Sequence, residues 1–141
     1  MTAPDEIVRR AGFEVLGTEG TVDEVRDVWR EFSSASAVPT VRIADDDPDP
    51  SAVETAWTRV VASTGLVSST GEFLLSVSAT GTHDAAWLRV RAGADARVLD
   101  LGPHDGEPDL VATNVGRDVT VAVTSEEEET WILVSARRHA R

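Results

Sequence analysis

Residues 71–79 read GEFLLSVSA, and an apolar side chain recurs there at every second position. The alternating set is Phe73, Leu75, Val77 and Ala79. Successive side chains of a β-strand point to opposite faces of a sheet, so this pattern predicts a strand with one face in the core. Before Gly71 the apolar spacing is helical, and after it the spacing favours strands.

The same alternation recurs in later segments that are separated by turn residues. It is found at Leu88 and Val90, and again at Val119, Val121 and Val123. Runs rich in Gly, Asp, Pro and Glu divide these segments, and such residues favour turns for conformational reasons. The pattern predicts about six short strands. Because tight turns join them, we expect a mostly antiparallel meander sheet.

A helix is predicted after Thr21. Thr21 and Glu24 have the spacing of a capping box, in which side chains bond to the free amides of the first helical turn. Apolar residues then follow at helical spacing, and these are Val22, Val25, Val28, Trp29 and Phe32. They predict an amphipathic helix with one buried face.

A second helix is predicted after Ser51, because Ser51 and Glu54 repeat the capping-box spacing. Its apolar face comprises Val53, Trp57, Val60 and Val61, and Gly65 ends it. A short strand, residues 40–44, is expected before it. The first 20 residues are ambiguous: a short helix over residues 4–10 and a brief strand over residues 13–16 are expected there.

Together these elements predict one α+β domain over residues 1–141, in which two or three N-terminal helices pack on the sheet. Residues 137–141, with the sequence RRHAR, are expected to form a frayed tail. No internal repeat and no long linker divides the chain.

The charge of the chain restricts its partners. Thirteen basic residues, all of them arginine, stand against 25 acidic ones, and the formal net charge is -12. Such a chain repels phosphate backbones and anionic membrane surfaces, so neither nucleic acid nor membrane is expected as a partner. Two origins of this composition stay open: codon bias in a high-GC genome, and adaptation to high salt.

Cysteine is absent, which excludes disulfides and thiolate ligands. The N-terminus has no hydrophobic signal core, and no apolar run approaches the roughly 20 residues of a membrane helix. A cytoplasmic location is therefore expected. No nucleophile elbow or phosphate-binding loop occurs, so we predict neither a catalytic residue nor a cofactor.

Two groups of residues are candidates for a metal site. The acidic loop offers Asp45, Asp47 and Asp49 as oxygen ligands, although it lacks the central Gly of an EF-hand. A solvated turn that favours the following helix explains the same residues. His83 and His104, each followed by Asp, could form a two-histidine site between turns, or they could be ordinary turn residues.

The strand pattern also predicts an arginine-rich sheet face. If residues 93–95 turn a hairpin, Arg97 lies opposite Arg91, with Arg89 and Trp87 further along the same face. Arginine pairs with carboxylates or phosphates, and Trp adds stacking. This face could bind an acidic segment or a small anion. Alternatively, its arginines pair with carboxylates of the chain itself.

We therefore expect a non-enzymatic protein-interaction domain, such as an adaptor, a chaperone-like protein or a regulatory factor, with another protein as its partner. A homodimer formed through an exposed edge strand is a further option. Two other functions stay open: a protein that binds a small anionic ligand through Trp87, Arg89, Arg91 and Arg97, and a metal-dependent enzyme that uses the histidines.

Overall fold

The computed structural model describes residues 3–33, 38–78 and 85–136. In these ranges the chain forms three α-helices, one 3₁₀ helix and seven strands. Their order is α1 (Pro4–Arg10), β1 (Phe13–Glu19), α2 (Val22–Phe32), β2 (Val41–Ala44), α3 (Ala52–Thr64), β3 (Glu72–Val77), β4 (Trp87–Ala92), η1 (Val98–Asp100), β5 (Asp109–Thr113), β6 (Val119–Glu126) and β7 (Glu129–Ala136).

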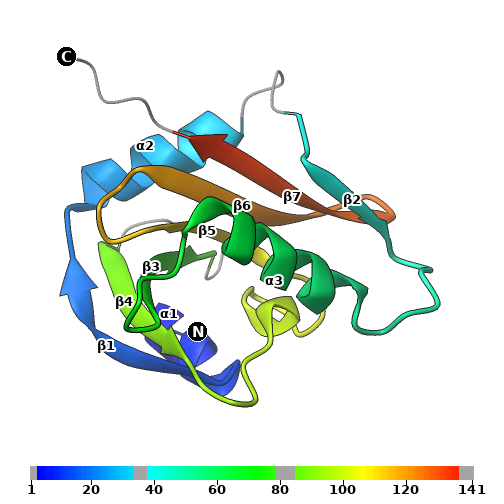
Figure 1. The fold of residues 1–141 in the computed structure, drawn as a ribbon, viewed down its shortest axis with the longest axis horizontal. Coiled ribbons are helices and arrows are strands. Elements are labelled where there is room, and N and C mark those ends of the chain that lie inside the picture. The colour runs from blue at the N-terminus through cyan, green and yellow to red at the C-terminus, as the bar shows by residue number, and fades with distance from the viewer. Residues whose placement is uncertain (1–2, 34–37, 79–84, 137–141) are drawn as a thin grey trace.

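All seven strands form one antiparallel sheet in the order β1-β4-β3-β5-β6-β7-β2 (Figure 1). The predicted α+β class and antiparallel sheet are confirmed, with seven strands where about six were expected. The segment β5-β6-β7 is a simple meander. The early strands β1 and β2 pair with later strands and lie at the two edges of the sheet.

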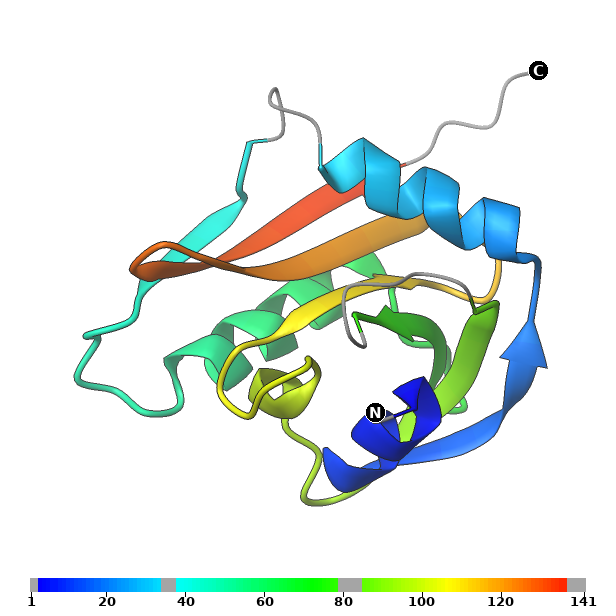
Figure 2. The ribbon, with the colours of Figure 1, turned by 180° about the vertical axis from the view of Figure 1, so that it is seen from behind.

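Helices cover both faces of this sheet. Helix α3 lies in front of it in Figure 1, whereas α2 lies in front in the reverse view of Figure 2. Alternation along β3 explains the two layers, because Phe73, Leu75 and Val77 belong to the larger core and Leu74 to the smaller one under α2. The alternating apolar residues that predicted the strands therefore mark the larger core.

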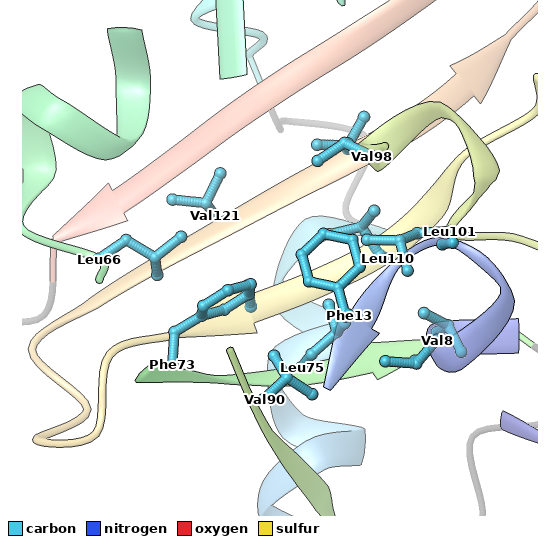
Figure 3. Close-up of a cluster of buried hydrophobic side chains, with 14 of the residues drawn as sticks. Val8, Phe13, Leu66, Phe73, Leu75, Val90, Val98, Leu101, Leu110 and Val121 are labelled. Atoms are coloured by element: carbon cyan, nitrogen blue, oxygen red, sulfur yellow. The ribbon is translucent and has the colours of Figure 1, made fainter. Parts of the chain in front are cut away.

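The larger core joins α1, α3 and η1 to one face of the sheet (Figure 3). Phe13 of β1 packs edge to face against Phe73 of β3, with ring centroids 6.1 Å apart. Trp57 of α3 also contacts Phe73, with the ring centroids 6.1 Å apart and the rings tilted by 53°. This apolar burial supplies most of the folding free energy, since each fully buried large side chain contributes roughly 1.5–3 kcal/mol.

The smaller core seats α2 by one polar contact as well as by apolar packing. Trp29 donates its indole Nε1–H to the hydroxyl of Ser76, at 2.9 Å in a buried environment. Leu74, Val111 and Leu133 of the sheet pack around it. The tryptophan thus fills the layer without leaving its N–H unpaired.

The predicted start of α2 is confirmed, because the Thr21 hydroxyl accepts a hydrogen bond from the Glu24 amide at 3.1 Å. The predicted cap of α3 is wrong, since the Ser51 side chain forms no capping bond. Glu54 instead accepts hydrogen bonds from the amides of Val98 and Leu99, at 2.8 and 3.0 Å. Its carboxylate therefore caps η1, a distant part of the chain.

None of the helices among the described residues is long and apolar enough to cross a membrane.

Candidate functional site

Three of the four residues of the predicted arginine-rich site lie on strand β4. Trp87, Arg89 and Arg91 occupy alternate positions of β4 and therefore lie on one face of the sheet. This is the face that α2 covers, because Trp87 belongs to the same buried cluster as Val25 and Val28 of α2. The two arginines extend beyond the apolar part of that layer and are half-buried.

Arg97 does not lie opposite Arg91, so the predicted hairpin is wrong. Arg91 lies between Glu14 of β1 and Glu72 of β3. Because β4 has a strand on each side, neither of its edges is free for the chain that follows. That chain turns away, and the amide of Arg97 donates a hydrogen bond to the carbonyl of Ala11 at 2.8 Å before η1 begins.

The two arginines of β4 are paired with carboxylates of neighbouring strands. Arg89 donates to Glu72 through Nε at 2.6 Å and to Glu19 through Nη1. Arg91 lies 3.4 Å from Glu14 and 3.6 Å from Glu72. Glu72 thus lies between two guanidinium groups, and the pairs cross three adjacent strands.

A third arginine, Arg117, extends this arrangement to α2. It lies in the turn between β5 and β6, where its backbone has a positive φ of 61°. Its Nε donates to Glu24 at 2.8 Å, and its Nη1 lies 3.4 Å from Glu19. Arg117 lies between Gly116 and Asp118, so its local sequence indicates a turn and nothing more. No local pattern identifies it, because its partners lie far away along the chain.

We refer to these residues as the charged ladder: Glu14, Glu19, Glu24, Glu72, Arg89, Arg91 and Arg117. It contains three guanidinium groups and four carboxylates, so it has no excess of positive charge. An anion that entered here would have to displace carboxylates already bound to the arginines.

Trp87 lies beneath the charged ladder and is fully buried. Its Nε1–H donates to Glu24 at 2.9 Å, on the same carboxylate oxygen that Arg117 contacts. Gly20 permits this close packing, since a Cβ at that position would lie 3.0 Å from the indole ring and 2.6 Å from the Glu24 carboxylate. The indole face is therefore occupied by the protein and is not an exposed stacking surface.

The charged ladder shifts the protonation equilibria of its members. Burial raises the pKa of Glu24, but hydrogen bonds from Arg117 and Trp87 outweigh this effect and hold the pKa below its ordinary value of 4.5. The Thr70 hydroxyl and the Arg89 guanidinium lower the pKa of Glu72. Glu72 and Glu19 together raise the pKa of Arg89. The pKa shifts of Glu24, Glu72 and Arg89 thus all favour the charged form.

The acidic loop before α3 uses its carboxylates locally. Asp47 accepts a hydrogen bond from the amide of Asp49, and Asp49 accepts one from the amide of Ser51, each at 2.8 Å. Asp45 is exposed beside them. Within the described ranges, no three His, Asp or Glu side chains come together in a way that could hold a metal ion.

The two-histidine hypothesis is only partly accessible to the structure, because His83 lies outside the described residues. His104 lies in an exposed turn, where its carbonyl accepts a hydrogen bond from the amide of Glu107 at 3.1 Å. The neighbouring Asp105 lies 3.8 Å from Arg10 of α1.

A different surface stands out at the opposite end of the sheet. The pairing of β2 with β7 extends one residue beyond β2. There the amide of Asp45 donates a hydrogen bond of 2.9 Å to the carbonyl of Glu128. This contact joins the acidic loop to the hairpin turn between β6 and β7, and Glu107 lies beside them. We refer to this group as the acidic end, which comprises Asp45, Asp46, Asp47, Asp49, Glu107, Glu126, Glu127, Glu128 and Glu129.

The acidic end differs from the charged ladder in lacking cations. None of its nine carboxylates forms an ion pair with any residue that the structure describes, and all but Glu129 are exposed. The runs at 45–49 and 126–129 were visible in the sequence. Their convergence was not, because it depends on the pairing of β2 with β7.

Two open hollows lie within the acidic end. One, of about 550 Å³, is lined by Ala44, Asp45, Asp46, Glu128 and Glu129. The other, of about 370 Å³, extends toward η1 and is lined by further residues that include Leu99, Glu107, Glu126 and Thr130. Both have the charge and the size to accept a basic side chain.

No protein-family model matches the chain, and no curated protein or solved structure is significantly similar to it.

Proposed function

We propose that this chain is a non-enzymatic protein-interaction domain that binds a basic surface of another protein through its acidic end. One observation carries the proposal: nine carboxylates from three separate segments converge without a cationic partner among the described residues. In the charged ladder, by contrast, the same chain pairs four carboxylates with arginines. An adaptor, a chaperone-like protein or a regulatory factor would use such a surface.

Electrostatics favours this role. Like charges held together repel one another, and a basic partner relieves that repulsion on binding. Complementary charge also accelerates encounter, with association rates that fall as salt is added. A partner with clustered Lys or Arg would gain both effects at the acidic end.

The anion-binding alternative has less support. At the charged ladder, Arg89 and Arg91 would have to release Glu19, Glu72 and Glu14 before they could bind a ligand anion. Arg97 lies near Asp100 instead, 3.9 Å away, and takes part in none of the ladder's ion pairs. An enzyme that uses His83 would require residues beyond the described ranges.

The proposal can be tested by pull-down at physiological ionic strength with two variants of equal net charge. The first replaces four residues of the acidic end: Asp45→Asn, Asp46→Asn, Glu127→Gln and Glu128→Gln. The control replaces four exposed acids elsewhere: Glu6→Gln, Asp23→Asn, Asp27→Asn and Asp95→Asn. We expect a stoichiometric partner to be retained by the wild type and the control and lost by the first variant. Equal retention by both variants would contradict the proposal.

A further inference from the structure

We infer that the open edge of β2 accepts an extended basic segment of the partner as an eighth strand of the sheet. This inference rests on the proposed function and specifies both the docking mode and the chemistry of the partner. Main-chain hydrogen bonds to an exposed sheet edge would supply affinity, and side-chain contacts on the two faces would supply specificity.

Among the described strands, β2 has a partner on one side only. It pairs with β7 in the register Val41 to Ile132 through Ala44 to Glu129. In Figures 1 and 2 it forms the margin of the ribbon, with no described element beyond it. A free edge of this kind presents unpaired N–H and C=O groups.

The backbone groups that face outward can be assigned by alternation. The amide of Asp45 bonds to Glu128 and therefore points toward β7, so the amides of Ala44 and Arg42 point away from it. The carbonyl of Ala44 accepts a hydrogen bond from Asp47, which agrees with this direction. The amides of Arg42 and Ala44 are thus the donors available to an added strand.

The other edge of the sheet is less suited to strand addition. Strand β1 has a bulge between Val15 and Gly17, which interrupts regular pairing. Its Glu14 and Glu19 already bind arginines of the charged ladder. β2 has neither obstacle.

The negative charge of the acidic end determines which residues an added strand should carry. Ala44 and Asp45, at the end of β2, line both hollows of the acidic end, and the exposed residues Asp45, Asp46 and Asp47 follow β2 directly. Residues of an added strand that lie beside Ala44 would therefore meet several carboxylates. Lys or Arg at those positions would be stabilised, whereas Asp or Glu would be repelled.

The beginning of β2 favours an apolar contact. Val38, three residues before β2, exposes 78% of its surface and could contact an apolar residue of the added strand. The matching segment thus carries basic residues toward one end and an apolar residue toward the other. A second copy of the chain fits this edge poorly, because antiparallel pairing of two β2 strands would place the acidic end of each copy beside Thr40 and Val41 of the other, which carry no positive charge.

The test uses two synthetic peptides of equal charge with wild-type protein. The first is Ac-GRVRVTVG-NH2, which carries its two arginines toward one end and its last valine toward the other. The second has the same sequence with N-methyl groups on all residues between its two glycines, which removes the backbone donors along both edges. Backbone amide shifts and hydrogen exchange would be measured by NMR during titration. We expect the first peptide to bind at least about tenfold more tightly, with shifts at Val41–Ala44 and slowed exchange at Arg42 and Ala44.

A protein variant provides a matched control. Arg42→Pro removes an outward amide without removing a bond to β7, as proline is tolerated on the open side of edge strands. Its amide spectrum would show whether the fold is retained, and weakened binding by at least about fivefold is expected. If this variant fails to fold, the N-methylated peptide still tests strand addition.

Four outcomes would overturn the inference. Equal affinity for both peptides would mean that charge alone holds them. Shifts confined to Phe13–Glu19 would place the docking edge at β1. Self-association that is lost on replacing Arg137, Arg138 and Arg141 with Gln would identify the chain's own tail as the occupant. The absence of peptide binding, together with a pull-down partner that the acidic-end variant releases, would contradict strand addition while leaving the proposed function standing.

Discussion

The charged ladder and the acidic end contain the same kind of residue in opposite circumstances. In the charged ladder, Arg89, Arg91 and Arg117 connect β1, β3, β4, α2 and the turn before β6. In the acidic end, carboxylates from three segments meet without a described cation. Ion pairs within the protein, as in the charged ladder, hold its elements together. Carboxylates without such pairs, as in the acidic end, can interact with another molecule.

Among the changes proposed here, Glu24→Ala is expected to lower the free energy of unfolding the most. The change removes the acceptor of the buried Trp87 N–H and of Arg117. An unpaired buried donor costs about 1–3 kcal/mol of unfolding free energy, so urea denaturation should show a loss of that size.

A control for this change lies on the same helix. Asp27→Ala breaks an exposed pair with Arg30, 3.1 Å long, and should cost no more than about 0.5 kcal/mol. Equal losses from the two variants would show that the charged ladder stabilises no more than an ordinary surface pair.

Acid should weaken the charged ladder. The pKa values of Glu24 and Glu72 lie below the ordinary value of 4.5 in the folded state. Their contribution to stability is therefore complete above that value, and it is lost as the pH falls through their folded pKa values. Unfolding free energy measured from pH 7 to about pH 3 should fall more steeply for the wild type than for Glu24→Gln. Parallel curves would show that Glu24 does not contribute to acid sensitivity.

Two turns with the same backbone strain offer a matched pair. Arg117 and Glu128 both have a positive φ, at 61° and 66°. Glycine relieves that strain at either position. Arg117→Gly should nevertheless lower the unfolding free energy by about 1 kcal/mol, because it removes charge-assisted hydrogen bonds. Glu128→Gly should raise it by about 0.5 kcal/mol. Thermal denaturation of both variants would check this, and changes of the same sign would remove the contrast between the two regions.

The smallest expected effect concerns salt. The acidic-end variant Asp45→Asn, Asp46→Asn, Glu127→Gln and Glu128→Gln should gain a few tenths of a kcal/mol at low ionic strength, since it relieves repulsion. The gain should vanish near 1 M salt, where the Debye length is about 3 Å. Denaturation across a salt series would measure it, with the four-residue control for comparison. A wild type that gains stability steeply up to molar salt would point to salt adaptation as the origin of the acidity.

Short-range patterns predicted much of the fold. The alternation at Phe73, Leu75 and Val77 identified the core face of β3, and Thr21 identified the start of α2. Both signals are local, because pleating and helix capping involve residues within a few positions of one another. The strand order was not predictable in this way, since it depends on pairings between distant segments.

Long-range partners account for the errors at the candidate site. Glu54 has the spacing of a capping residue, yet its partners Val98 and Leu99 lie on η1. Arg97 was placed by an assumed hairpin, which the two neighbours of β4 exclude. Arg117 resembled any turn residue. In each case the position of the side chain depends on residues that are distant in the sequence, and no local pattern reveals such contacts.

The positions of β1 and β2 at the two edges bear on how the chain matures during synthesis. β2 leaves the ribosome early, but its only neighbour, β7, is the last of the described strands to be made. β1 likewise has no strand to pair with until β4 has been synthesised. Until these partners arrive, Ile43 and Phe13 have no sheet to cover them, and such non-local pairing folds slowly. The nascent chain therefore exposes these apolar segments until β4 and β7 have been made, and it should depend on cellular chaperones more than a domain built from neighbouring hairpins.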